Sequence, residues 1–126
     1  MKANFIQIAA IVGATAVGIG AFGALGLEPI LESNGRSDTF ETAVKYHFYH
    51  ALAMLIVAVW YHFQPERKIL VKAMWSFLIG ILIFSGSLYV LSLTGITWLG
   101  AITPLGGVSF IVGWLFLFWA GKKQGI

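Results

Sequence analysis

The chain has 126 residues, of which 59% are hydrophobic and 10% charged, with a net charge of +3 and no cysteine. Soluble domains carry roughly a quarter charged residues, so this composition excludes a soluble globular domain. The lack of cysteine also excludes disulfides, thiolate metal sites and cysteine catalysis. The few cations stand at the ends of apolar runs and form no basic stripe, so we expect no nucleic-acid partner.

Charge-free segments predict the number of membrane crossings. Residues 3–27, 46–64 and 73–121 contain no Asp, Glu, Lys or Arg, and the last run can hold two helices and a turn. A helix needs about 20 apolar residues to cross a hydrocarbon core roughly 30 Å thick. We therefore predict an all-α integral membrane protein in the lipid bilayer. Residues 1–126 would form a single domain of four transmembrane helices in an antiparallel bundle.

The first helix is predicted over residues 4–27, and its apolar run is too long for a cleaved secretory signal. Small residues recur at every fourth position in two rows, which are Ala10, Ala14, Gly18 and Ala16, Gly20, Ala24. Such rows let helix backbones approach closely in lipid, where packing drives association. A second interpretation stays open, in which Gly18, Gly20 and Gly23 leave room for a ligand.

The second helix is predicted over residues 39–63, after a polar connection that contains the turn signal Asn34-Gly35. Asp38 fits an N-cap, and Glu41, three residues later, fits its reciprocal partner in a capping box. Glu41 and Lys45 are four residues apart, so we expect them to form an ion pair on the helix surface.

The third helix is predicted over residues 69–93, after a charged turn at 64–68, and the fourth over residues 104–121. Thr103 and Pro104 favour a helix start, because threonine can cap and proline at the first helical position loses no needed hydrogen bond.

The distribution of Lys and Arg predicts that both termini are cytoplasmic. Arg36 and Lys45 would then lie outside, whereas the inner side would hold Lys2, Arg67, Lys68, Lys72, Lys122 and Lys123. Cytoplasmic ends of membrane helices carry such an excess of cations. Most tryptophans would fall in the aromatic belts at the interfaces, but Trp114 would lie near mid-span.

Polar residues of the second and third helices are predicted to share one layer in the outer half of the membrane. His47 and His50 would lie roughly 12 Å and 16 Å below the outer end of their helix, given a rise of about 1.5 Å per residue. Polar groups in lipid need partners within the protein, so the layer should face the bundle interior. Its candidate members are Tyr46, His47, Tyr49, His50, Ser85, Ser87 and Tyr89. The glycines predicted to serve helix packing are Gly18, Gly20, Gly23, Gly86, Gly106, Gly107 and Gly113.

Helical spacing groups these residues into faces. On the second helix, one face holds Ala43, His47, His50 and Met54. On the third helix, one face holds Ser76, Gly80, Ile83 and Ser87, and another holds Ser85, Tyr89 and Ser92. The sequence leaves open which of these two faces meets the histidines.

Two interpretations of His47 and His50 follow. They are either buried groups hydrogen-bonded across the bundle, or ionisable groups that handle protons, ions or a ligand. His47, His50 and Met54 offer too few ligands on one helix for a metal site, so we predict no metal and no cofactor. No catalytic triad, carboxylate pair or phosphate-binding loop is present in the sequence, so we expect no enzymatic activity.

Several segments together resemble a known family. They are Gly20-Ala21-Phe22-Gly23-Ala24, Thr42-Ala43-Val44 with Tyr46, His50-Ala51-Leu52-Ala53, Phe84-Ser85-Gly86-Ser87-Leu88-Tyr89, and Thr103-Pro104-Leu105-Gly106-Gly107 with Gly113-Trp114. The chain is similar along nearly its whole length to domain of unknown function 423, the family of YgdD-like small bacterial membrane proteins with eukaryotic transmembrane relatives.

The resemblance implies a multi-pass protein of the bacterial inner (plasma) membrane with no established biochemical activity. His50 matches the family's histidine in its HALA segment, and Ser85 and Ser87 match its SGS motif. Many members carry a histidine directly after the GAFGA segment, and this chain departs from them with Leu25.

Two functional hypotheses result. The first is a non-enzymatic structural or accessory protein that associates through glycine-rich helix faces with a second copy (a homo-oligomer) or with a partner membrane protein. The alternative is a small transporter, channel or ligand-binding membrane protein that uses the outer-half polar layer around His47 and His50.

Overall fold

The structure is a computed structural model and describes residues 4–123. The elements in chain order are α1 (Phe5–Gly26), α2 (Glu28–Ser33), α3 (Ser37–Phe63), α4 (Lys68–Gly80), the π-helical turn η1 (Ile81–Ser85), α5 (Gly86–Thr94), the 3₁₀ turn η2 (Thr97–Ala101) and α6 (Thr103–Lys123). Four segments are long and apolar enough to cross a membrane: Phe5–Gly23, Ser37–Phe63, Lys68–Thr94 and Thr97–Lys122. The predicted all-α fold with four spanning helices is therefore confirmed.

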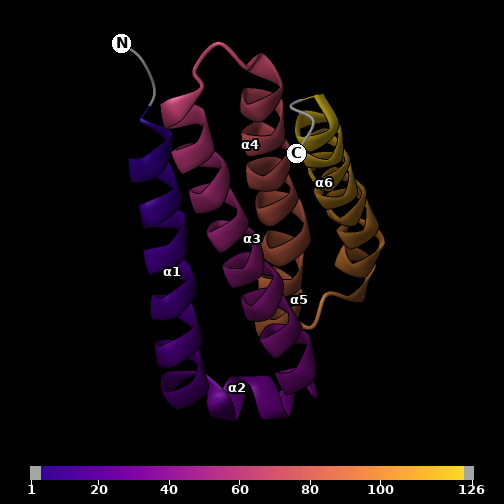
Figure 1. Cartoon of the computed structure of the whole chain (residues 1–126). Helices are drawn as coiled ribbons and strands as arrows, with labels where there is room; N and C mark the ends of the chain where they lie inside the picture. The colour runs from indigo at the N-terminus through magenta and orange to yellow at the C-terminus, as the bar shows by residue number, and fades with distance from the viewer. Residues whose placement is uncertain (1–3, 124–126) are drawn as a thin grey trace.

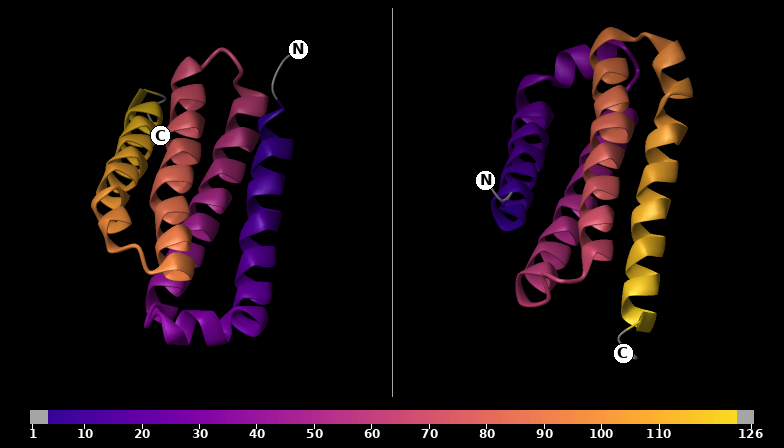
Figure 2. Two further views of the ribbon diagram at one scale, coloured as in Figure 1. Left: turned by 180° about the vertical axis from the view of Figure 1, so that it is seen from behind. Right: turned by 90° about the horizontal axis from the view of Figure 1, so that it is seen from above.

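The four long segments run antiparallel, and each packs against its neighbour in the sequence (Figure 1). α1 packs on α3, α3 packs on the continuous rod formed by α4, η1 and α5, and α6 packs on α4 and η1. Seen from behind and from above, α1 and α6 lie at the two edges of the bundle (Figure 2). The described start of α1 and end of α6 lie at the same end of the molecule, opposite to α2 (Figure 1).

The apolar core lies mainly between α3 and α4. Met54 and Val57 of α3 and Leu70 and Phe77 of α4 are fully buried there. Many large apolar side chains point outward instead, such as Phe22, which is 77% exposed. A soluble protein would hide such side chains, whereas in a bilayer they face acyl chains.

The connection between α1 and α3 differs from its prediction. Its middle part is the short helix α2, with Pro29 in the first turn and Leu31 buried against the bundle. α3 begins at Ser37, so the predicted capping box at Asp38 is wrong: the N-cap residue is Arg36, and no described side chain caps this helix. Proline in a first helical turn loses no needed hydrogen bond, so Pro29 is compatible with a short helix in this polar segment.

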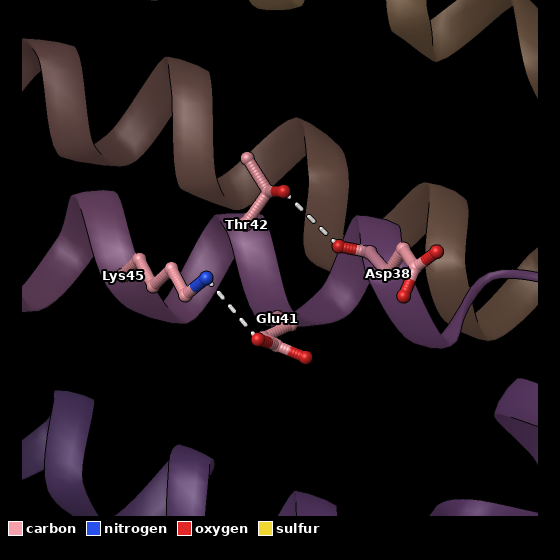
Figure 3. A network of polar contacts seen from close by, with 4 residues as sticks. All are labelled: Asp38, Glu41, Thr42 and Lys45. Atoms are coloured by element: carbon pink, nitrogen blue, oxygen red, sulfur yellow. Dashed lines mark hydrogen bonds and ion pairs between the residues drawn. The ribbon is translucent and has the colours of Figure 1, made fainter.

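Asp38 lies inside the first turn of α3 as a result. Thr42 donates its hydroxyl to the Asp38 carbonyl oxygen at 3.0 Å (Figure 3). The predicted pair of Glu41 and Lys45 is confirmed, with 3.1 Å between the carboxylate and the ammonium group (Figure 3). Both side chains are more than half exposed, so this pair contributes little stability.

The third span contains a π-helical turn that the sequence pattern did not predict. The predicted helix over 69–93 is observed from Lys68 to Thr94, but it widens into η1 at Ile81–Ser85. The wide turn changes which residues face α6. Ile83 was grouped by spacing with Ser76, Gly80 and Ser87, and these three contact α6. Phe84, and not Ile83, packs on Gly106 and Phe110 between them.

Glycines allow α6 to approach α4 and η1 closely. A Cβ atom on Gly106 would overlap the backbone of Phe84, and one on Gly113 would overlap the ring of Phe77. Gly80 faces the ring of Phe110 in the same way. Close backbone contact at small residues is how helices associate in lipid, where no hydrophobic effect drives them together.

At the other end of the bundle, Arg67 joins the turn before α4 to α6. Its guanidinium donates to the Ala120 carbonyl oxygen at 2.7 Å and lies 5.7 Å from the ring centre of Trp60. Cations stabilise the C-terminal end of a helix, so this contact favours the observed docking of the end of α6.

Replacing Gly106 with alanine should destabilise the bundle by about 1–3 kcal/mol, because the new methyl group meets backbone atoms that cannot rotate away. Unfolding of the purified protein in detergent, followed by circular dichroism, measures the change. Gly86→Ala is the matched control, since no described atom lies within 4 Å of its added Cβ. Equal stability of the two variants would contradict the proposed close contact.

Candidate functional site

His47 joins three helices in the half of the bundle near α2. Its Nε2 lies 3.0 Å from the Val12 carbonyl oxygen and 3.3 Å from the Thr15 hydroxyl, both on α1. Its Nδ1 lies 2.7 Å from the phenol oxygen of Tyr89 on α5. Because a carbonyl only accepts, Nε2 carries the proton and Nδ1 accepts from Tyr89 in the neutral ring.

His50 faces α6 instead. Its Nδ1 donates to the Tyr46 carbonyl oxygen one turn earlier, at 2.8 Å, and its Nε2 accepts from the indole N–H of Trp114 at 3.0 Å. The imidazole stacks on the ring of Phe110, with 3.6 Å between centroids and 10° between planes. Both ring nitrogens are therefore satisfied within the protein.

The two histidines differ in what they can do chemically. An indole N–H only donates, so the contact with Trp114 requires an unprotonated Nε2 and fixes His50 as a neutral ring. The nearest partner of each ring nitrogen of His47, the Val12 carbonyl for Nε2 and the Tyr89 phenol for Nδ1, can accept a hydrogen bond. His47 can therefore take up a second proton without losing either contact, whereas His50 would lose Trp114.

The serines of the third span also bond within the bundle. Ser85 is fully buried and donates to the Ala43 carbonyl oxygen of α3 at 2.8 Å. Ser87 lies 2.6 Å from the hydroxyl of Thr103, at the start of α6. Ser92 donates to its own helix, and its carbonyl oxygen accepts from the side chain of Asn34 at 3.0 Å. These contacts connect α5 and η1 to α3, to α6 and to the segment after α2.

The predicted layer thus divides into two groups on different sides of α3. His47, Ser85 and Tyr89 meet on the side of α1 and α5, while His50 turns toward α6. Tyr46 packs its ring on Phe84 at 4.8 Å and is 40% exposed. Tyr49 is 54% exposed, and its ring lies 5.9 Å from that of Tyr46 between centroids.

The glycines selected from the sequence fall into two classes. Gly20 and Gly23 face Val44 and Phe40 of α3, and the class that faces a neighbouring helix also includes Gly106, Gly107 and Gly113. At Gly18 and Gly86, a Cβ would meet no described atom within 4 Å. These two therefore do not serve packing among residues 4–123.

The sequence pattern did not reveal the partners that complete the histidine contacts. They are Val12, Thr15, Phe110 and Trp114. Nor did it reveal Thr103 as the partner of Ser87. Trp114 did carry a signal, because it stands near mid-span and away from the interfacial belts. A buried acceptor for its N–H accounts for that position.

Two grooves adjoin the polar groups. One of about 870 Å³ lies between α1 and α5 and has Thr15, Phe40 and Tyr89 among its lining residues. Another of about 410 Å³ lies between α3 and α6 over Tyr46, His50 and Trp114. Over residues 4–123, no three His, Asp or Glu side chains gather in a way that could hold a metal ion.

Comparison with known proteins assigns the family. The family model "Protein of unknown function (DUF423)" matches residues 19–107. The chain belongs to this family. The chain is similar to UPF0382 membrane protein YwdK of Bacillus subtilis (strain 168), with 45% identity over 94% of this chain and 96% of the relative. No solved structure matches.

Two further relatives extend the similarity. UPF0382 membrane protein SH2409 of Staphylococcus haemolyticus is 46% identical over 90% of both chains. A UPF0382 membrane protein of Haemophilus influenzae is 38% identical over 98% of both chains. With four membrane-spanning helices, the chain is a multi-pass protein of the bacterial plasma membrane, and the family to which it belongs has no named activity.

Replacing Trp114 with phenylalanine should destabilise the protein by about 1 kcal/mol, because Nε2 of His50 loses its donor while most of the ring packing stays. Equilibrium unfolding in detergent micelles measures the loss. Trp98→Phe is the control, since Trp98 is 65% exposed in η2. If both variants lose the same stability, the hydrogen bond between Trp114 and His50 contributes nothing.

Proposed function

We propose that this DUF423 protein is a non-enzymatic accessory protein of the membrane, and that its intramembrane polar groups join helices rather than move solutes. The observation that carries the proposal is the bonding of His50. Both of its nitrogens are occupied by groups of the protein, and its ring is stacked on Phe110. A residue that relays protons or ions needs a free nitrogen at some stage.

The serines support the same proposal. The hydroxyls of Ser85 and Ser92 donate to backbone carbonyls, and that of Ser87 bonds to Thr103. A nucleophilic serine instead donates to a general base. Each hydroxyl used in this way has an acceptor for its proton within the protein, which hydrocarbon would not supply.

We also propose that the protein associates with a second copy or with a partner membrane protein. α1 packs against α3 on one side only, and its outward face exposes Ile11 and Val17 to more than half of their surface. The predicted glycine-rich faces on α6 are used within the bundle, which leaves Gly18 and Gly86 as the predicted packing glycines with room for an approaching helix.

A second candidate is a small transporter, channel or ligand-binding protein that uses His47. One specific observation favours it. His47 bonds to Tyr89, and Tyr89 lines the groove between α1 and α5. His47 can also change its charge without losing its two partners.

Substitution of the histidines separates the two candidates. His50→Ala should lower stability by about 1–3 kcal/mol, because it leaves the buried N–H of Trp114 without an acceptor. Proton and ion flux in liposomes that contain the wild-type protein should stay at the level of empty liposomes. Flux above that level that is lost in His47→Ala, with Tyr49→Phe as an exposed control, would favour the second candidate.

We propose further that both termini are cytoplasmic. Arg67, Lys68 and Lys72 lie at the end of the bundle opposite to α2, as does the end of α6 with Lys122 and Lys123. Arg36 and Lys45 lie at the α2 end, and Lys2 of the predicted set is outside the described residues. An excess of cations at one end is typical of the cytoplasmic side.

Single cysteines test this orientation against a background without native cysteine. Ser33→Cys should react with a membrane-impermeant thiol reagent in intact cells, because it lies at the end of α2 and is exposed. Glu66→Cys and Lys122→Cys should react only after the cells are opened. Labelling of Glu66→Cys in intact cells would show that this turn lies outside, which would contradict the proposed orientation.

A further inference from the structure

The groove between α1 and α5 has the dimensions of one membrane leaflet. Its lining residues on α1 extend from Thr15 to Gly26, with Leu27 following at the end of the helix. Twelve residues of α-helix span roughly 18 Å. Half of a hydrocarbon core roughly 30 Å thick is roughly 15 Å. The groove therefore covers about one leaflet, from mid-membrane to the end where α2 lies.

The walls of the groove are apolar and partly built from glycine. Its lining consists of Thr15, Gly18, Ile19, Phe22, Gly23, Leu25, Gly26, Leu27, Phe40, Tyr89 and Leu93. At Gly18 and Gly26 the space beyond the backbone holds no described atom within 4 Å. A volume of about 870 Å³ lies within the range of known ligand sites, which is roughly 300–1,000 Å³.

A second pocket, called the polar pocket here for its charged residues, lies at the α2 end. This pocket of about 410 Å³ is lined by Glu28, Glu32, Glu41 and Lys45 together with apolar residues such as Leu31 and Val44. Gly23 and Phe40 line both the groove and the polar pocket, so their close contact lies between the two spaces. Leu27 of the groove directly precedes Glu28 of the polar pocket in the chain, so charged groups stand at the α2 end of the hydrophobic groove.

The charge of the polar pocket selects among head groups. Lys45 is paired with Glu41, whereas Glu28 and Glu32 form no ion pair within residues 4–123. The pocket therefore has two more carboxylates than ammonium groups. Such a field attracts a cationic group and repels an anionic one.

We propose that the groove binds one acyl chain of a lipid whose head group carries a primary ammonium, as phosphatidylethanolamine does, with the ammonium directed toward Glu28 and Glu32. A groove open to hydrocarbon is filled by hydrocarbon, and the length of this groove fits a chain from the leaflet on the α2 side. Phe40 lies where the chain meets the head group. The inference does not rest on the proposed accessory role, but it uses the same groove as the second candidate and places a lipid at Gly18 instead of an approaching helix.

Lipid retention by the full chain tests the proposal. The protein is purified from mixed micelles that hold equal amounts of phosphatidylethanolamine and phosphatidylglycerol with identical chains, and native mass spectrometry counts the retained lipids. We expect the ethanolamine lipid to be retained over the glycerol lipid by roughly threefold, which corresponds to about 0.7 kcal/mol, as exposed ion pairs supply.

Two sets of variants assign the site. Gly18→Leu and Gly26→Leu place a side chain in the groove, with a Cβ that meets no described atom of a neighbouring helix, and each should abolish retention. Gly86→Leu, which also has open space but lies outside the groove, should retain lipid like the wild type. Glu28→Gln with Glu32→Gln should keep a bound lipid but lose the preference for the ammonium head group.

Several results would overturn the proposal. They are equal retention of the two lipids by the wild type, retention unchanged in both groove variants, or equal loss in Gly86→Leu. A dimer mass that disappears in Gly18→Leu would show that a second copy, and not a lipid, occupies the groove. Because Glu28 and Glu32 are exposed, their double variant should stay folded and tests the head group even if a groove variant misfolds.

Discussion

Hydrocarbon offers no partner for a polar group, and the arrangement of this bundle depends on how α3 meets that constraint. The carbonyl oxygen of Ala43 accepts the hydroxyl of Ser85, His47 bonds to α1 and α5, and His50 bonds to Trp114 of α6. Each contact satisfies a group that would otherwise be unpaired in lipid. Together they fix α3 against every other spanning helix, which apolar packing alone does less specifically because lipid tails compete for the same surfaces.

His47 and His50 were predicted to lie in one polar layer, but in the structure they belong to two separate groups of contacts. Residues three apart on an α-helix point in directions about 60° apart. That divergence is small enough for both to count as one face in a periodic pattern, and both are buried as a face requires. It is large enough for one ring to reach Tyr89 and the other to reach Trp114. The sequence could predict burial but not the choice of neighbour.

The four spans were predictable within a few residues, because hydropathy over about 20 residues is a property of length and composition. The pair of Glu41 and Lys45 was predictable for a similar reason, since it depends on one helix only. The helix α2 and the turn η1 were not, because α2 is shorter than the hydropathy window and polar, and η1 lies inside a run that is helical by every local pattern. Partners across helices, such as Thr103 for Ser87, depend on crossing geometry that no local spacing encodes.

Because of the π-helical turn at Ile81–Ser85, the contacts of α5 depend on the number of residues per turn in the third span as well as on their identity. A π-helical turn holds about one residue more than an α-helical one, so the residues after it keep the orientation that a regular helix one residue shorter would give them. If the turn became α-helical with all its residues kept, every later residue would rotate by about 100° relative to α4. Ser87 and Tyr89 would then lose Thr103 and His47 together, whereas a side-chain substitution removes one contact at a time. Among the described residues, the π-helical turn therefore determines which side chains of α5 face α3 and α6.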